Sequence, residues 1–512
     1  MTSVMNHDTY DYVVVGAGSA GCVVAARLSE QPDVRVLLLE AGGPDSHPDV
    51  QNPVMWPTLF KGELDWGYDT QPLRHANDRI DHIPRGKMLG GCHSHNASAW
   101  VRGHSADFDT WADQGNAGWD WQSVLRLYRK IENWQGPASE LRGTGGPMWV
   151  TPNAEPNPIA AAFVEAGSTV GIPSVADNNG PTMEGTSFFN LTIKDGRRYS
   201  VVHAYLQPAI ERPNLTVLTC AETQRLSLDG TRCVGVNYVH DDTEKTAFAE
   251  QEVILCAGVI GSPRALLLSG IGPAKDLNEL GIPVVADLAG VGRNLQDHPL
   301  LGGINYECKG ALPEPRNNGA ESAMWWRSDP QLTSPNIQAV ILEFPFATPE
   351  LVGRLPSEHC YAIAPSVARP ASRGTVKLVS ADPSVAPAID VNFLARDADI
   401  EAMLVAVDIC REMGASSAYN DLRKREIMPG NLGRADMIEF IRQSVSTYFH
   451  PTGTCKMGID AQSVVDPELR VCGITGLRVA DASVMPTVTT GNTNAPTVMI
   501  GEMAAELVQV SP

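Results

Sequence analysis

The chain has 512 residues, of which 43% are hydrophobic and 19% charged, as in globular enzymes and unlike disordered or fibrous proteins. Its 39 Lys and Arg against 59 Asp and Glu give a net charge of −20, which argues against nucleic acid or an anionic membrane surface as a partner. A chain of this length exceeds one ordinary hydrophobic core, so two domains are expected.

The sequence predicts neither a membrane span nor a secretion signal. No apolar run reaches the roughly 18–20 residues of a membrane span, and residues 1–10 lack the apolar core of a secretion signal. The ten cysteines form no C-x-x-C pair, and most lie in apolar runs such as 253–257, as expected for reduced, buried thiols. The sequence therefore predicts a cytoplasmic protein without a membrane span.

The most informative motif opens the chain. Residues 11–15, apolar from Tyr12 onward, predict a strand, 16–21 form a glycine turn, and 22–28 predict an apolar helix. A second strand, 36–39, leads directly into Glu40. This order is typical of a dinucleotide-binding βαβ unit, in which the acidic residue accepts hydrogen bonds from a ribose. The motif indicates a dinucleotide but specifies neither which one nor the reaction.

Each residue of the glycine turn has an expected role. Gly16 allows the tight turn, Gly18 lets a pyrophosphate approach the backbone, and Gly21 lets the helix pack closely on the strand. Ser19 and Ala20 complete the turn, where free N–H groups at the helix start face phosphate.

Further elements follow in alternation. Residues 85–105 are rich in Gly, His and Ser and predict a loop leading into a helix, and 143–158 predict a crossing between domains. Short strands are expected at 215–218 and 235–239, and a longer one at 252–258 precedes a helix.

The C-terminal half changes character. Residues 300–430 carry alternating apolar patterns, for example 336–342, and many prolines, which favour an antiparallel sheet with loops. A strand at 477–481 and a closing helix from about Thr497 return to the pattern of the first half. The sequence thus predicts an α/β cofactor domain in separated pieces with a substrate domain inserted.

Four motif blocks resemble the glucose-methanol-choline (GMC) flavoprotein oxidoreductases. They are the N-terminal turn, residues 86–96, residues 258–272, and a C-terminal pair at 449–458 and 491–496. The similarity spans nearly the whole chain and is nearest to choline-oxidising and to aryl-alcohol or hydroxymethylfurfural-oxidising members. It implies FAD as cofactor and oxidation of a primary alcohol to an aldehyde by hydride transfer to flavin N5.

The resemblance also implies a domain division. A discontinuous, Rossmann-type FAD-binding domain is expected from residues 1–155, 195–298 and 455–512. An α+β substrate domain built on an antiparallel sheet is expected from residues 156–194 and 299–454.

The C-terminal pair of blocks implies the catalytic residues, His450 and Asn492. An alcohol C–H is a poor hydride donor until the hydroxyl proton is lost, and imidazole is a suitable base near neutral pH. An amide beside it can orient the hydroxyl and stabilise the alkoxide without competing as a base. From the sequence alone, a packed core histidine and a turn-capping asparagine remain the alternatives.

His95 has a separate implied role. The run from Cys92 to His95 has no second pair of ligands nearby, so no metal site is expected. Choline-oxidising members carry a histidine at the position of His95, covalently linked to the flavin ring. The resemblance therefore implies a histidyl–FAD bond, which should make the flavin a stronger oxidant.

Other cofactor contacts are implied by position, and each could equally be structural packing. They are Trp66 beside adenine or ribose, Met88, Gly91 and Asn96 on the loop over the flavin, Thr223 on a strand facing adenine, and Ala480, Asp481 and Thr493 near the ribityl chain and flavin.

The substrate is less defined. Choline-oxidising relatives carry a carboxylate after a Trp-Trp pair, whereas this chain has Trp325-Trp326-Arg327. Aromatic residues, among them Phe344 and Tyr448, suggest a pocket for an aryl, furfuryl or pyridine methanol, or simply core packing. Arg327 or Arg369 could hold a carboxylate or be surface charge.

The electron acceptor and even the reaction class stay open. O₂ is the expected acceptor, because positive charge near the flavin stabilises superoxide. The alternatives are a dehydrogenase that uses a quinone or another carrier, and a hydroxynitrile lyase that keeps FAD without redox chemistry. The sequence specifies no oligomeric state.

Overall fold

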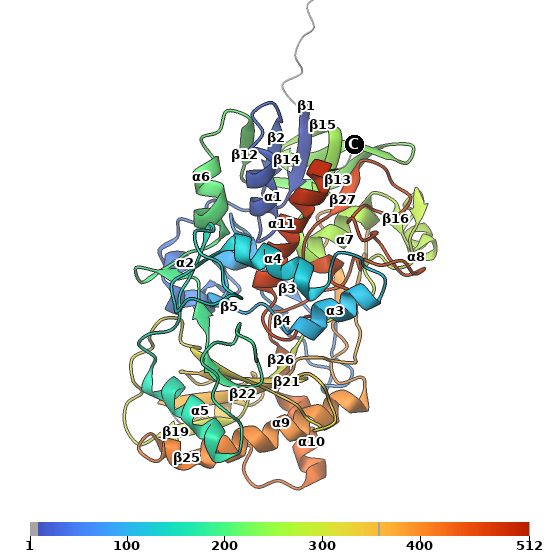
Figure 1. Ribbon diagram of the computed structural model, residues 1–512. Helices are drawn as coiled ribbons and strands as arrows, with labels where there is room; N and C mark the ends of the chain where they lie inside the picture. Colours follow the sequence, from blue (N-terminus) through green and yellow to red (C-terminus); the bar gives the residue numbers. More distant parts are fainter. Residues whose placement is uncertain (1–8, 357–358, 511–512) are drawn as a thin grey trace, which may run out of the picture.

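The computed structural model describes residues 9–356 and 359–510 and arranges them around two sheets (Figure 1). The first sheet lies in the upper half of Figure 1 and the second in the lower half, beside the helices α5, α9 and α10. The polar residues 1–8, in which the sequence predicts no secretion signal, lie outside the described part of the chain.

The first sheet has seven strands and contains the N-terminal motif. Its order is β12-β2-β1-β15-β14-β13, with β27 also paired to β15. The strands β12, β2, β1, β15 and β27 run parallel, and β13 and β14 extend them as an antiparallel meander. Their bounds are β1 Thr9–Val15, β2 Val36–Leu39, β12 Leu215–Leu218, β13 Ala221–Asp229, β14 Arg232–His240, β15 Thr243–Leu255 and β27 Leu477–Val479.

Strands β2 and β27 and the last three residues of β1 and of β15 are buried, which explains their apolar runs. Val14 lies between Leu38 of β2 and Ile254 of β15, so pieces of the chain far apart in sequence share one core. Helix α1 (Gly21–Leu28) packs on the C-terminal helix α11 (Asn494–Val510). Helices α3 (Ser105–Asp113), α4 (Trp121–Ile131) and α7 (Gly258–Leu268) complete this half.

The second sheet has eight strands and is antiparallel throughout. Its order is β25-β19-β22-β21-β20-β8, with β18 joining β22 to β26. Helix α5 (Pro158–Thr169) contacts β8 and β20, and α9 (Asp397–Ala415) contacts β22. The strands are β8 Gly185–Phe188, β18 Pro299–Leu301, β19 Asn305–Cys308, β20 Ser322–Trp326, β21 Ile337–Leu342, β22 Cys360–Val367, β25 Arg423–Met428 and β26 Val445–Thr447.

Helix α9 departs from the expected sheet and loops of residues 300–430. Its 19 residues, together with α10 (Arg434–Ser444), lie beside the second sheet in Figure 1. Buried Met403, Val407 and Cys410 follow helical spacing, so the signal was present in the sequence. The α+β expectation for this half is confirmed, but the helix lies inside the stretch expected to be strands.

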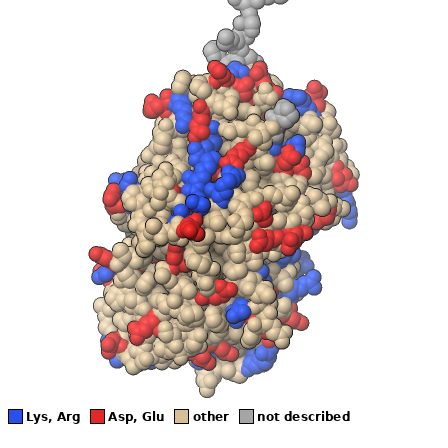
Figure 2. Space-filling view, viewed as in Figure 1, with Lys and Arg blue, Asp and Glu red and all other residues tan. Residues whose placement is uncertain are grey.

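The surface agrees with the acidic composition. Figure 2 shows acidic side chains scattered over the visible face and one stripe of basic side chains where α4 crosses the upper half. On α4, Arg126 and Lys130 both pair with Glu506 of α11, so much of that positive charge is neutralised. All ten cysteines are free thiols. Across residues 9–356 and 359–510, no helix is both long and apolar enough to cross a membrane.

Candidate active site

One long cavity lies where the two sheets meet, and most of the site residues expected from the sequence line it. It extends from the glycine turn after β1 to the segment that carries His450. The expected residues that line it are Gly16, Gly18, Ser19, Ala20, Glu40, Trp66, Gly91, His95, Asn96, Thr223, His450, Asp481, Asn492 and Thr493.

Three expected residues do not line this cavity. Gly21 begins α1, and a Cβ there would lie 1.8 Å from the carbonyl oxygen of Gly16, so its role is helix packing. Met88 is buried in a small cluster with Val50 and Leu59. Ala480 is buried in the main core directly after β27.

The glycine turn leaves its backbone open toward the cavity. Gly16 has φ +96°, and a Cβ there would lie 2.6 Å from the carbonyl oxygen of Cys256. A Cβ on Gly18 would meet no atom within 4 Å, so this residue presents bare backbone. The N-terminus of α1 follows at once, which suits a phosphate group.

Glu40 holds the same turn from the neighbouring strand. Its carboxylate accepts hydrogen bonds from the N–H groups of Ala17 (2.9 Å) and Gly42 (2.8 Å). Burial raises the pKa of Glu40 to about 7 despite these bonds. Glu40 therefore shapes the turn as well as lining the cavity.

Several polar atoms along the cavity have no partner among the described residues. They include Thr223 Oγ1, Asn492 Oδ1, Asn494 Nδ2 and Arg264 Nε, all buried and all on residues that line the cavity. Buried polar groups normally find a partner, so their arrangement fits a long ligand with polar groups along its length. A dinucleotide cofactor has this character.

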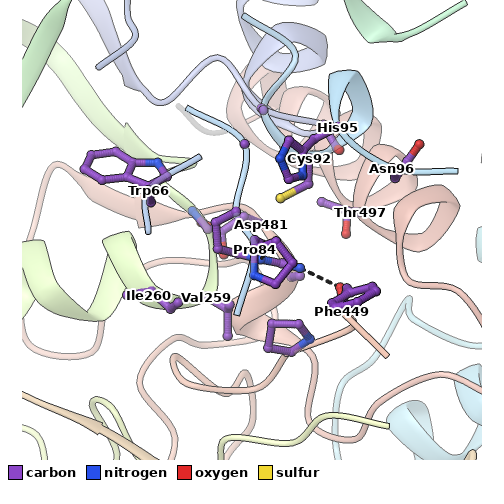
Figure 3. Close-up of a pocket in the computed structure, with 18 of the residues that line it drawn as sticks. Trp66, Pro84, Cys92, His95, Asn96, Val259, Ile260, Phe449, Asp481 and Thr497 are labelled. Carbon is purple, nitrogen blue, oxygen red and sulfur yellow. Dashed lines mark hydrogen bonds between the residues drawn. The ribbon is translucent and has the colours of Figure 1, made fainter. Parts of the chain in front are cut away.

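The loop around the short helix Gly91–Ser94 forms one wall. Figure 3 shows Cys92, His95 and Asn96 of this loop beside Thr497 of α11, with Trp66, Val259 and Ile260 farther along the cavity. His95 Nε2 lies 3.3 Å from the carbonyl oxygen of Leu59, so a hydrogen bond there leaves Nδ1 unprotonated. Burial lowers the pKa of His95 to about 4.

His450 also lines the cavity and is 8% exposed. Its backbone N–H donates to Asp297 Oδ1 at 2.9 Å, and its Nδ1 lies 3.0 Å from Nδ1 of His298. Burial, followed by His298 and Arg85, lowers the pKa of His450 well below its ordinary value. The imidazole is therefore neutral near pH 7.

Arg85 lines the cavity, although no motif in the sequence singles it out. Its guanidinium donates to the carbonyl oxygen of Phe449 at 2.6 Å, the dashed line in Figure 3. It thereby holds the backbone beside His450 while bringing a positive charge into the site. His298 also escaped the sequence analysis, because its partner His450 is 152 residues away in the chain.

The turn that carries Asn492 is fixed by a buried carboxylate. Asp107 of α3 accepts hydrogen bonds from the backbone N–H (2.7 Å) and the hydroxyl (2.9 Å) of Thr490. It also accepts from the backbone N–H of His104 (2.9 Å) and from the guanidinium of Arg369. Arg369 is thus a structural partner of Asp107 and does not line the cavity.

The end of the cavity near His450 is apolar and rich in aromatic rings. Trp56 and Phe60 contact each other and Phe449, with centroid distances of 5.1–6.5 Å, and Phe60 contacts His95 at 5.1 Å. The other apolar residues that line this end are Ala97, Ala99, Phe189, Leu300, Ala320, Val340, Leu342, Phe346 and Tyr448.

A buried carboxyl pair lies next to this apolar end. Glu321 follows Ala320 and Glu343 follows Leu342, and both carboxyl groups are fully buried. Glu321 accepts hydrogen bonds from Asn153 Nδ2 (2.8 Å) and from the backbone N–H of Asn157 (3.0 Å). Burial and the neighbouring Glu321 raise the pKa of Glu343 to about 9, so Glu343 is protonated near pH 7.

The family models and the similar proteins agree on one family. The GMC oxidoreductase models match residues 10–300 and 370–501. Human mitochondrial choline dehydrogenase is 39% identical over 99% of this chain and 91% of its own, and an alcohol dehydrogenase [acceptor] of Pseudomonas putida is 38% identical over 98% and 95%.

A solved structure extends the match to the fold. Pyridoxine 4-oxidase of Mesorbium loti superposes with a TM-score of 0.93 at 36% identity, covering 97% of this chain and 98% of the other. The resemblance expected from the motif blocks and the expected fold are both confirmed. The chain belongs to the GMC oxidoreductases, a family of FAD-dependent enzymes.

Proposed function

We propose that this enzyme oxidises an uncharged primary alcohol to its aldehyde, with His450 as the base that takes the hydroxyl proton. The observation that carries this proposal is that His450 and Asn492 both line the cavity, whose apolar end is lined by several aromatic rings. FAD, when bound, supplies the acceptor for the hydride that leaves the alcohol carbon.

The protonation state of His450 supports the base role. Burial keeps its imidazole neutral across the neutral pH range, so a nitrogen is available to accept a proton. The amide of Asn492, whose Oδ1 has no protein partner among the described residues, can donate through Nδ2 to the alcohol oxygen as that oxygen becomes negative. Arg85 adds a positive charge that favours the alkoxide.

The lining of the cavity supports an uncharged substrate. Its carboxylates, Glu40, Glu222 and Asp481, all lie on the strands and turns of the first sheet. Arg327, which follows the Trp-Trp pair, donates to the carbonyl oxygen of Leu332 at 3.0 Å and does not line the cavity. An alkyl or aryl group fits this end better than a cation or a carboxylate.

We propose O₂ as the electron acceptor. Among the relatives, the pyridoxine enzyme is named an oxidase and the Brucella choline enzymes are named oxygen-dependent. A proton held by His450 after substrate oxidation would place positive charge where reduction of O₂ benefits from it. A carrier-dependent dehydrogenase is the alternative, as in the name of the Pseudomonas putida relative.

Two further assignments are proposals of the same kind. We propose that His95 bonds covalently to FAD through its unprotonated Nδ1, since Nε2 faces the carbonyl of Leu59. We also propose the domain division into a cofactor part (1–155, 195–298, 455–512) and a substrate part (156–194, 299–454), which matches the distribution of strands between the two sheets.

An anaerobic screen of alcohols tests the proposed reaction. Benzyl, furfuryl and long-chain primary alcohols should bleach the flavin absorbance faster than choline does, and air should then restore the colour with formation of peroxide. His450→Ala should slow flavin reduction by roughly 10²–10⁴-fold, the usual range for a lost general base. Reduction of the variant at a near-normal rate would exclude His450 as the base, and colour restored only by a quinone would exclude O₂.

A further inference from the structure

We propose that His298 is a positioning residue that fixes the tautomer of His450, so that the unprotonated Nε2 of His450 faces the alcohol. This inference rests on the proposed role of His450 as base. The carrying observation is the contact between the two Nδ1 atoms at 3.0 Å, with the rings nearly perpendicular at 85°. Two nitrogens at this distance share one proton, so one of them donates and the other accepts.

The backbone holds the two rings in a fixed relation. Gln296 and Thr452 exchange backbone hydrogen bonds of 3.0 Å and 2.8 Å, and the N–H of Tyr448 donates to the carbonyl oxygen of His298 at 3.0 Å. Asp297 accepts from the N–H of His450 and from the hydroxyl of Thr447. The segment 296–298 therefore holds both the main chain and the ring of His450.

The proposed base role of His450 determines which nitrogen donates. His298 is fully buried, and burial lowers its pKa to about 4, so it is neutral and carries one proton near pH 7. Its Nε2 is buried and has no hydrogen-bond partner within residues 9–356 and 359–510, whereas its Nδ1 contacts His450. A base at Nε2 of His450 must be unprotonated, which places the proton shared by the two rings on Nδ1 of His450.

This assignment leaves Nδ1 of His298 as an acceptor. Nδ1–H of His450 then donates to it, and Nε2 of His450 is the free base. Nε2 of His450 has no hydrogen-bond partner within residues 9–356 and 359–510, and His450 lines the cavity. Other charged or titratable groups around the pair are Arg85, which acts on His450, and Asp297, whose carboxylate is engaged by Thr447 and the backbone. The ring of Tyr448 also lies 4.4 Å from that of His450, and burial raises the pKa of its hydroxyl, so it stays neutral.

The same contact also helps after proton transfer. When Nε2 of His450 takes the hydroxyl proton, Nδ1–H still donates to neutral His298, now from an imidazolium, and such charge-assisted bonds are stronger than neutral ones. The partner of the ring is thus a neutral imidazole, whereas the carboxylate of Asp297 binds the backbone N–H of His450. In this arrangement one imidazole, that of His298, orients the other, that of His450, which acts as the base.

His298→Leu, His298→Gln and the control His203→Gln test this inference by stopped-flow flavin reduction of the holoenzyme. His203 is a half-buried histidine that does not line the cavity. We expect His298→Leu to lower the limiting reduction rate roughly 10²-fold with little change in alcohol affinity. His298→Gln should recover part of this rate, since its amide oxygen accepts from Nδ1–H, and His203→Gln should match the wild type.

Two readouts separate positioning from a merely structural role. The apparent pKa of the base in the pH profile of reduction should fall in His298→Leu, because the imidazolium loses its acceptor. Neutron diffraction of the wild-type holoenzyme should place deuterium on Nδ1 of His450 and not on Nε2. Deuterium on Nε2 of His450, or an unchanged reduction rate and pH profile in His298→Leu, would overturn the inference.

The outcome is distinguishable from failure of the proposed function. If His450→Ala reduces flavin normally, the base assignment itself is wrong. If His450→Ala is slow and His298→Leu is normal, only the role of His298 is wrong. Should His298→Leu fail to fold, the pH profile of His298→Gln and the neutron map of the wild type still decide the question.

Discussion

Replacing Asp107 by alanine should loosen the turn that carries Asn492. The substitution removes a buried carboxylate that accepts two hydrogen bonds from Thr490, one from the N–H of His104 and one from Arg369. Breaking a buried, hydrogen-bonded charge pair costs about 3–5 kcal/mol. Arg369 is partly exposed, so the lower half of this range is expected.

The expected shift in melting temperature follows from chain length. An unfolding entropy of about 2.1 cal/mol/K per residue gives about 1.1 kcal/mol/K for 512 residues. A loss of about 3–4 kcal/mol therefore lowers the Tm of the holoenzyme by about 3–4 °C. Differential scanning calorimetry measures this shift, with Asp113→Ala as a control, because Asp113 is an exposed carboxylate on the same helix.

The rate of flavin reduction distinguishes a role of Asp107 in positioning Asn492 from a role in ordinary packing. Well below the melting temperature, Asp107→Ala should still bind FAD but reduce it more slowly, because a displacement of about 1 Å at a catalytic group can cost 10²-fold in rate. Asp107→Asn keeps one acceptor oxygen, so its reduction rate and its Tm should lie between those of the wild type and of Asp107→Ala. A normal reduction rate and a Tm within about 1 °C of the wild type would refute the reasoning.

Two other expectations concern single side chains. Glu343→Gln should raise Tm most at alkaline pH. The wild type loses stability as the pH rises from 4.5, the pKa of this carboxyl in the unfolded chain, toward about 9, where the carboxyl of folded Glu343 ionises. Parallel curves of Tm against pH for the two proteins would contradict this. Acid-precipitated wild-type protein should retain its yellow colour and His95→Ala should release it, and complete release from the wild type would exclude a histidyl–FAD bond.

The cofactor end of the site was predictable because its chemistry is local. Gly16, Gly18 and Glu40 stand at fixed spacings within one βαβ unit, so a turn without side chains and an acid at the next strand end can be inferred from sequence. The structure adds that Glu40 also binds the backbone of the turn, a contact that leaves no sequence signal.

The substrate end was less predictable because it is assembled from distant single residues. Trp56, Leu300 and Val340 come from three separate segments, and each alone is an ordinary apolar residue. His298 looks like an isolated histidine until the sheet strands β18 and β26 place it beside His450. Helix α9 was missed because the prolines and alternating runs around it outweighed its own helical spacing.

The pairing of β27 with β15, and of α11 with α1, has a consequence for biosynthesis. The glycine turn is translated long before its neighbours β27 and α11, which lie far later in the sequence. Until they arrive, the growing chain exposes the apolar face of α1 and an open edge of β15, both of which invite aggregation. Assembly of the cofactor site must therefore wait until β27 and α11 have been translated, which lengthens the time for which this apolar surface is exposed.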